Sequence, residues 1–192
     1  NSTSAVLITN TGAKVITVSA ATPEAVRAAR RMDLAGFIGA TNTLRLDNLG
    51  VGPFQLANSF NLDVGSRLEI SNSFMILDGA AGGSFNQFAG TILVAGGGLI
   101  TTNSDPLAAN GQPGLRIGRS GFGIATLHAG DIIAADELVV GDLGGANGSL
   151  IQSNGLVQTF GVFYIADNPA SVGLVEVYGG ALIATNASAR LG

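Results

Sequence analysis

The sequence predicts an all-β fold: a right-handed parallel β-helix, or β-solenoid, of about 25 residues per coil, with an N-terminal strand pair and a short helix. The first observation is a repeated pair of glycines. Four segments start with glycine and place a second one at their eighth position: GSFNQFAG from Gly83, GIATLHAG from Gly123, GSLIQSNG from Gly148 and GLVEVYGG from Gly173. The last three start 25 residues apart. A fixed period of this length is typical of repeat architectures.

The second observation is the content of one repeat. Residues 123–147 contain three short runs, ATLHA, DIIAA and ELVVG, which are too short for helices and rich in strand-favouring residues. Three strands make one coil, and each is expected to lie roughly 4.8 Å from its counterpart in the next coil. Glycine, Asn and Asp suit the corners because they tolerate positive φ. Gly141-Asp142 and Ala166-Asp167 are therefore expected at one corner of successive coils.

The aligned repeats predict which side chains point inward. One inward column holds Ile92, Ile132, Val157 and Leu182, and a second holds the smaller or β-branched Val94, Ala134, Thr159 and Ala184. Leu93, Ile133 and Ile183 are expected to share one outward position, and Phe88, His128 and Tyr178 another. The first repeat reaches its third strand at Ile117, after an insertion containing TTNSDPLAANGQPG that is expected to form a corner loop.

The elements before the repeats are less regular. AVLIT and KVITVS read as two strands joined by NTGA. A helix is expected in TPEAVRAARRMDLA, with Thr22 as N-cap, Pro23 in the first turn and Glu24 beside the positive helix end. Its arginines, Arg27, Arg30 and Arg31, read as a solvated face. About two imperfect coils are expected between Gly39 and Gly82. The predicted domains are 1–38, with strands, a capping helix and a possible donor strand, and 39–192, the solenoid.

Composition and charge exclude several classes. The chain has 29 Gly in 192 residues, and its hydrophobic content of 46% argues against disorder. The net charge of -4 and the pI near 4.7 disfavour a nucleic-acid partner. Cysteine is absent, so disulfides and thiol chemistry are excluded. The longest apolar stretch is broken by glycines and too short to span a bilayer. The opening residues contain no signal-peptide pattern, so an extracellular chain would already have lost its signal peptide.

The predicted surface favours self-association. Charged residues are 11% of the chain, against about 25% in typical proteins. An exposed monomer would therefore be poorly protected from self-association. The apolar outward columns suggest contacts with other copies. The alternative is that the N-terminal strands, the helix or the inserted loop cover these columns within one chain.

The two ends of the predicted stack suggest how copies join. The last residues, ARLG, match LRIG at 115–118, so they are expected to form a third strand with an open β edge. The N-terminal strands of another copy could pair with that edge. The predicted assembly residues are Val6, Ile8, Val15, Val18, Ala189 and Leu191. A head-to-tail contact of this kind generates a filament unless the rotation closes a ring.

Few residues suggest chemistry. His128 is the only histidine and lies in a repeat strand, so a structural role is expected. Asp131, Asp136 and Glu137 lie near it, but no other repeat has this cluster. Asp142 and Asp167 could share a cation, although corner turns explain both, and an Arg119–Asp142 contact is expected to be a modest surface ion pair. No catalytic, cofactor or metal residues are predicted.

The runs LRIGRSGFGIATLHAGDIIAADELVVGD and FYIADNPASVGLVEVYGGALIATNASARLG resemble the repeats of secreted bacterial β-solenoid proteins, those of autotransporter passengers and exosortase-sorted (PEP-CTERM type) surface proteins. The resemblance implies extracellular or cell-surface material, structural or adhesive, with no cofactor. The expected function is a non-enzymatic structural protein that self-assembles head to tail into a filament or surface layer through β-edge or donor-strand contacts. One alternative is an adhesin or a solenoid that binds extracellular glycan. Another is a polysaccharide lyase or hydrolase.

Overall fold

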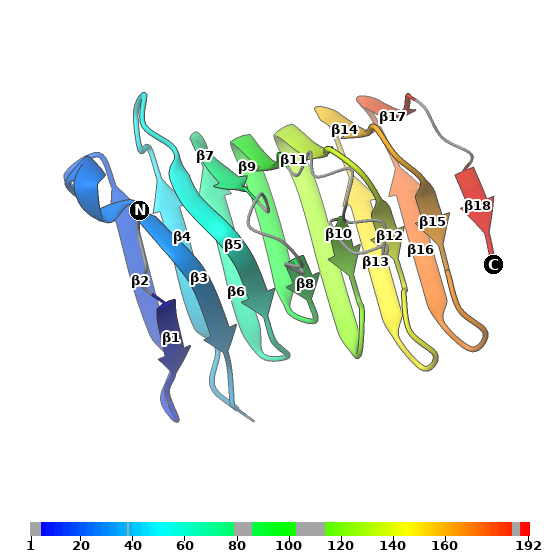
Figure 1. Ribbon diagram of the computed structural model, residues 1–192, viewed down its shortest axis with the longest axis horizontal. Coiled ribbons are helices and arrows are strands. Elements are labelled where there is room, and N and C mark those ends of the chain that lie inside the picture. The colour runs from blue at the N-terminus through cyan, green and yellow to red at the C-terminus, as the bar shows by residue number, and fades with distance from the viewer. Residues whose placement is uncertain (1–4, 38, 79–85, 103–113, 186–188) are drawn as a thin grey trace.

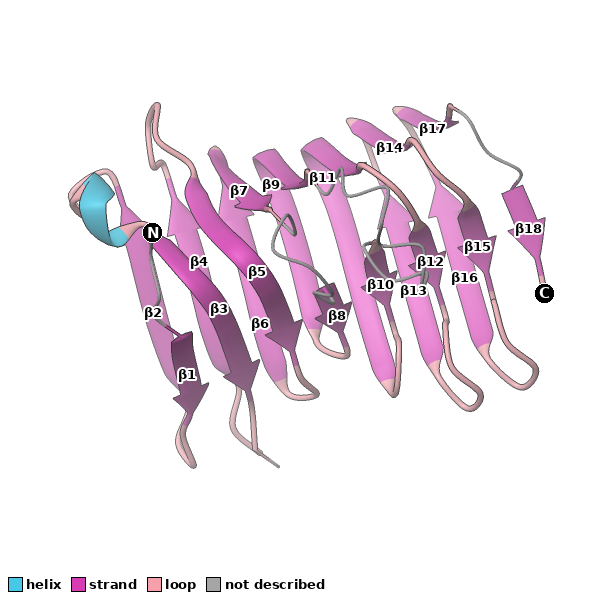
Figure 2. Ribbon diagram, in the orientation of Figure 1, coloured by secondary structure: helices cyan, strands magenta, loops and turns pink. Residues whose placement is uncertain are grey.

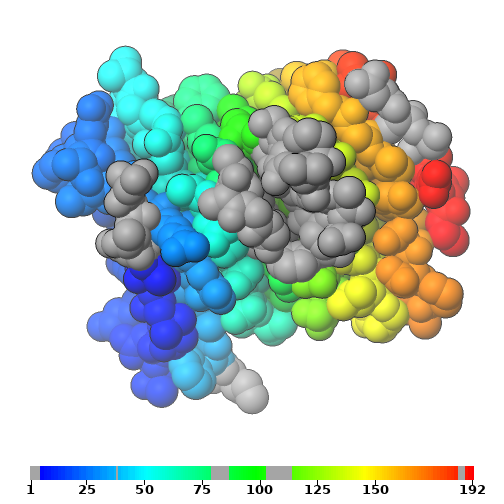
Figure 3. Space-filling model, viewed as in Figure 1, coloured from blue at the N-terminus to red at the C-terminus, as the bar shows by residue number. Residues whose placement is uncertain are grey.

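The computed structural model describes residues 5–37, 39–78, 86–102, 114–185 and 189–192. The protein is an all-β parallel solenoid of about seven coils. Within the described residues, eighteen strands form one sheet in which every pair of strands is parallel. In Figure 1 the chain runs along the long axis from one end of the stack to the other. Figure 3 shows the same order as successive colour bands. The predicted fold is therefore confirmed.

Each coil has three sides, here called faces A, B and C. Face A consists of β2 (Lys14–Ser19), β4 (Asn42–Asp47), β6 (Ser66–Ser71), the first parts of β9 (Thr91–Thr101) and β11 (Phe122–Ala134), β13 (Asn147–Gln152) and β16 (Val172–Val177). Face B consists of the first parts of β3 (Ala28–Ala35) and β5 (Phe54–Leu62), then β7 (Ser73–Leu77), the last parts of β9 and β11, β14 (Leu156–Thr159) and β17 (Ala181–Ala184).

Face C consists of β1 (Ala5–Thr9), the last parts of β3 and β5, β8 (Asn86–Phe88), β10 (Leu115–Ile117), β12 (Leu138–Val140), β15 (Phe163–Ile165) and β18 (Ala189–Leu191). Figure 1 shows face C in front and face A behind it. The inward residues of all three faces form one apolar core. Its two largest fully buried side chains, Phe60 and Phe88, pack edge-on with ring centroids 5.6 Å apart.

The repeat alignment is confirmed for three copies and wrong for the first. Gly123, Gly148 and Gly173 lie side by side in the ladder. Thr91 pairs with Ile124, however, so the residue that matches Gly123 is Gly90 and not Gly83. The true first copy is GTILVAGG, which also has a glycine at its eighth position, Gly97. The insertion lengthens the interval between Gly90 and Gly123, and that hides the period in the sequence.

The corrected alignment changes which residues share each predicted column. The inward column of face B is Leu99, Ile132, Val157 and Leu182, and its neighbour is Thr101, Ala134, Thr159 and Ala184. Ile92 and Val94 are buried as predicted, but on face A, where they pair with Ala125 and Leu127. Outward, Ile133 and Ile183 share a column while Leu93 lies on face A beside Thr126. Phe88 is fully buried on face C, so it does not share an outward column with His128 and Tyr178.

The predicted helix of residues 22–35 is wrong. A single turn of 3₁₀ helix, Glu24–Val26, is followed by β3, as Figure 2 shows. Thr22 does not cap it; its Oγ1 accepts a hydrogen bond from the Ser19 amide. The segment becomes a strand because Met32 and Leu34 alternate into the core and pair with Phe60 and Leu62. Tertiary packing overrides local helix propensity here.

The two N-terminal strands are confirmed, but they do not pair with each other. β1 pairs with β3, and β2 pairs with β4, so both extend the same ladders as the rest of the chain. The two imperfect coils expected between Gly39 and Gly82 are confirmed in β4 to β7. Ile117 also aligns with Val140 and Ile165 as expected. Most of the predicted insertion loop, residues 103–113, lies outside the described residues.

Candidate assembly interface

The core columns remain apolar up to the last described coil, where they become exposed. Leu182 continues the column of the fully buried Val157, yet it is 37% exposed. Leu191 continues the column of Ile165 and the fully buried Val140, and it is 81% exposed. The last described coil therefore presents core-type side chains along its outer edge.

An apolar cavity lies beside the exposed side chains of this coil. A cavity of about 320 Å³ lies between the last two coils, lined by apolar side chains that include Val157, Phe163, Leu182 and Ala189. The last described strands are β16, β17 and β18, of which β17 and β18 line the cavity. Among the described residues no strand pairs with their outer edges. This end therefore offers an apolar opening and three rows of backbone hydrogen-bonding groups.

The first coil has a similar opening. A cavity of about 770 Å³ is lined by side chains of β1, β2, β3 and the 3₁₀ turn, with Leu44 and Phe54 behind them. Ile16 at the mouth is 37% exposed, whereas its ladder neighbour Leu44 is fully buried. Both ends of the stack thus present the same chemistry, an apolar core framed by β edges.

The structure places the six predicted assembly residues at these two ends. Val6, Ile8 and Val18 line the cavity of the first coil, and Ala189 lines that of the last. Leu191 lies on the outermost face C strand. Val15 is 58% exposed and does not line the cavity, because alternation in β2 turns Ile16 inward instead. Ile16 and Val18 are two residues apart in a strand, so the sequence spacing alone predicts that both side chains point to the same side.

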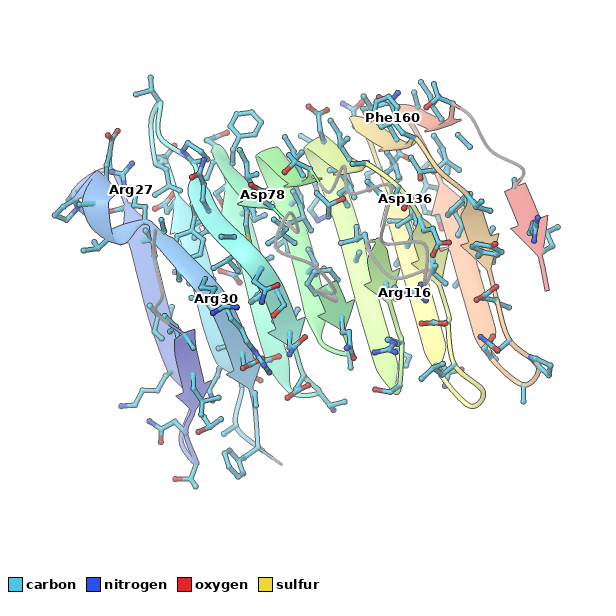
Figure 4. The ribbon with its side chains drawn as sticks, viewed as in Figure 1. Arg27, Arg30, Asp78, Arg116, Asp136 and Phe160 are labelled. Carbon is cyan, nitrogen blue, oxygen red and sulfur yellow. The ribbon has the colours of Figure 1, made fainter. Side chains whose placement is uncertain are left out.

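A largely buried ionic cluster links two neighbouring coils, and its central pair, Arg116 and Asp142, was missed in the sequence. Arg116 and Asp142 are 4% and 2% exposed, and Arg116 Nη1 donates to Asp142 Oδ2 at 2.6 Å. Arg116 Nη2 donates to Glu137 Oε2 at 2.9 Å, and Arg119 Nε lies 3.4 Å from Asp142 Oδ2. Figure 4 shows Arg116 at β10. The predicted surface ion pair of Arg119 with Asp142 is therefore part of this cluster, in which the Asp142 carboxylate is buried and contacts both arginines.

Glu137 is the perturbed acid of this cluster. Burial raises the pKa of its carboxyl above the ordinary value of 4.5, although the Arg116 guanidinium lowers it. The neighbouring carboxylates of Asp136, Asp167 and Asp142 raise it further. Asn168 from the next coil donates to the Asp142 backbone oxygen at 2.7 Å. The arrangement cross-links neighbouring coils, which is a structural role.

Arg27 is a second buried cation, whereas the sequence predicted that it lies on a solvated face. Its guanidinium donates to backbone oxygens of Thr22 at 2.8 Å and Leu49 at 2.8 Å, and also to those of Ser19, Ala20 and Gly52. These oxygens belong to the corners of the first two coils. Arg27 therefore joins those corners near the N-terminal opening, where Figure 4 labels it.

The residues considered for catalysis are not brought together. His128 is exposed at the bend between faces A and B, Asp131 lies on face B, and Asp136 lies past the end of β11. No hydrogen bond or ion pair joins the three in the described structure. No group of three or more His, Cys, Asp or Glu there is placed to hold a metal ion. The described helix is three residues long, and none in this part of the chain could cross a membrane.

Comparisons with protein-family models, with curated proteins and with solved structures found no match to this chain.

Proposed function

We propose that this protein is an extracellular structural protein whose copies join head to tail into a filament or surface layer. The observation that supports this best is the exposure of core-type columns in the outermost coils. Val157 and Val140 are fully buried, while Leu182 and Leu191 beyond them are exposed. Burying such side chains contributes about 1.5 to 3 kcal/mol each. A second copy that stacks on this coil would recover that free energy.

The contact is proposed to be an edge-to-edge β contact. β1 already pairs with β3 over five residues, from Ala5 to Thr9. A donor-strand exchange would have to break those pairs, whereas an edge contact uses only the outer side of the first coil. The last coil of one copy would then meet the first coil of the next as parallel strands. Because the two surfaces differ, the contact propagates in one direction.

A pair of end-blocked variants tests the proposal. Ile16→Asp puts a carboxylate at the N-terminal opening, and Leu182→Asp puts one at the other opening. Each variant alone is expected to sediment as a monomer under conditions in which the wild-type chain forms filaments in electron micrographs. An equimolar mixture is expected to form dimers and stop there, since each variant keeps one intact end.

The matched control is Phe122→Asp, at an apolar residue that is 56% exposed and lies in β11, in the middle of the stack; it is expected to assemble normally. Filaments from either end-blocked variant alone, or a mixture that stays monomeric, would contradict the proposal. A wild-type chain that sediments as a monomer at high concentration would contradict it as well. Circular dichroism of each variant shows whether the fold is retained.

A second candidate function is glycan binding on face C. The outward column there is polar over three neighbouring strands, Asp33, Asn61 and Gln87, and Asn61 Nδ2 donates to Asp33 Oδ1 at 2.5 Å. Saturable glycan binding that is lost in Gln87→Ala, by a chain that does not assemble, would favour this candidate. If the chain binds no glycan in the same measurement, the glycan-binding candidate is wrong.

A further inference from the structure

The outward side of face B carries mostly apolar side chains over five neighbouring strands. Its central column is Ile76, Ile100, Ile133, Gln158 and Ile183. Phe74 and Leu156 lie in the adjacent column. We call Phe74, Ile76, Ile100, Ile133, Leu156 and Ile183 the face B patch. Phe74 is 43% and Ile183 41% exposed. Phe160, beside β14 at the edge of this face in Figure 4, extends the apolar surface.

Charge is almost excluded from this face. In β7, β14, β17 and the face B parts of β9 and β11, all within the described structure, Asp131 is the one charged residue. Face A by contrast has the surface ion pairs of Arg45 and Arg67 with Glu69. A charged glycan, a nucleic acid or a lipid headgroup would find few counterions on face B. The patch fits an apolar, flat partner.

The N-terminal elements do not cover the patch. β1 and β2 lie in the stack on faces C and A, and the 3₁₀ turn lies at the first coil, as Figure 2 shows. The N-terminal strands and the helix were two of the three segments that the sequence suggested could cover the apolar outward columns within one chain. The third, the insertion, falls mostly on residues 103–113, outside the described part of the chain.

We propose that the face B patch is a side-to-side contact with the same patch of a second copy. Both surfaces carry strands at the same spacing of about 4.8 Å, so rows of side chains from one copy fit between rows of the other, with sheets about 10 Å apart. Ile133 lies in the middle strand of the five. A two-fold axis lying between the sheets at this strand brings the Ile133 side chains of the two copies opposite each other.

The size of the patch sets the strength of the contact. Five strands of about four residues cover roughly 24 by 14 Å, so a pair buries about 700 Å² in total, below the roughly 1,200 Å² of a stable interface. Free subunits therefore pair weakly. The contact becomes strong when subunits are linked end to end and the patches add. That strengthening rests on the proposed function, whereas the pair contact itself does not.

Cysteine cross-linking tests the contact, because the natural chain has no cysteine. Ile133→Cys is compared with Ile151→Cys, at an outward position of β13 on face A that is also half-buried. Both are oxidised at high protein concentration. Ile133→Cys is expected to yield at least about ten times more covalent dimer on a denaturing gel. Equal yields from the two variants, or no dimer from Ile133→Cys, would overturn the proposal.

The same variant placed in the Ile16→Asp/Leu182→Asp background separates this contact from head-to-tail assembly. The cross-link is expected to persist there, since face B is intact. In the end-competent chain, Ile133→Lys is expected to leave single filaments but to abolish their bundling. Filaments of Ile133→Lys that still bundle would contradict the side-to-side contact but not the head-to-tail contact. Cross-linking without any filaments would contradict the head-to-tail proposal alone.

Discussion

At the residue scale, the corner between faces C and A shows how backbone conformation selects a side chain. Gly118, Gly141 and Ala166 occupy it in successive coils, with φ of 69°, 78° and 58°. Their amides donate to the same relative position one coil earlier, as Ala166 does to Val140 at 2.9 Å. Glycine adopts positive φ without cost, whereas alanine is strained there by about 1 kcal/mol.

Ala166→Gly is therefore expected to stabilise the protein by up to about 1 kcal/mol, the relieved strain less the larger chain entropy of glycine. The measurement is the urea midpoint followed by circular dichroism, with an unchanged slope. The control Ala146→Gly, at a buried alanine whose φ is not positive, is expected to lower the midpoint. A lower midpoint for Ala166→Gly would show that its methyl group contributes more than the strain costs.

Glu137 makes stability depend on pH. Its pKa is raised in the folded chain, chiefly by burial, so the folded state holds this proton more tightly than the unfolded state. Stability is thus expected to fall as pH rises from about 4.5 through the raised pKa. Asp63, whose pKa burial and Asp33 also raise from 3.8, acts in the same direction.

Glu137→Gln should make the decline shallower over that window, as measured by denaturation midpoints between about pH 4 and pH 7. Asp63→Asn serves as the comparison, since it removes the other acid with a raised pKa and leaves the Arg116 cluster intact. An identical pH profile for wild type and Glu137→Gln would contradict this assignment.

At the element scale, the bend between faces A and B repeats as a stack of glycines. Gly97, Gly130, Gly155 and Gly180 all have positive φ, between 80° and 90°. A Cβ on Gly155 would collide with the backbone oxygen of Gly130 in the coil before, and one on Gly180 with that of Gly155. The second glycine of each repeat is therefore required both for its φ and for close stacking.

Gly155→Ala is expected to destabilise the solenoid by about 3 kcal/mol or more, since it adds a backbone collision to the cost of positive φ. Gly145→Ala separates the two effects: Gly145 has φ of 82°, but an added methyl group there would meet nothing within 4 Å, so about 1 kcal/mol is expected. Thermal denaturation of both variants measures the difference. Equal losses would show that stacking at the bend tolerates a methyl group.

At the scale of the whole molecule, stability is a sum over neighbouring coils. A middle strand such as β11 pairs on both edges, with β9 on one side and β13 and β14 on the other. β16, β17 and β18 each pair on one edge among the described residues. In such quasi-one-dimensional proteins the outer units open first.

Amide hydrogen exchange is expected to be slowest in β9 and β11 and fastest in β16 to β18, with a gradient between them. Assembly would slow exchange in β16 to β18, because a stacked copy would occupy their free edges. Uniform protection across all strands would instead indicate that the solenoid opens as a single cooperative unit.

The repeats show how far sequence reasoning reaches. The glycine spacing and strand-favouring runs predicted the solenoid and its columns from Gly123 onward, because each coil repeats local requirements that the sequence states directly. The error at Gly83 arose because two segments share the same glycine spacing, and only pairing between Thr91 and Ile124 distinguishes them. The residues predicted for assembly are Val6, Ile8, Val18 and Ala189, which line the two cavities, Leu191 on the last described face C strand, and Val15, which is exposed outside the first cavity.

The sequence by itself determined the period, the three-sided coil and the apolar character of the core, since these depend on residue types at fixed intervals. Tertiary structure alone decided that Met32 and Leu34 belong to a strand, that Arg116 and Asp142 are buried partners, and that apolar outward residues gather on face B. Each of these depends on which segments lie beside one another. Pairing between distant residues is set by the free energy of the whole stack, and no local pattern contains it.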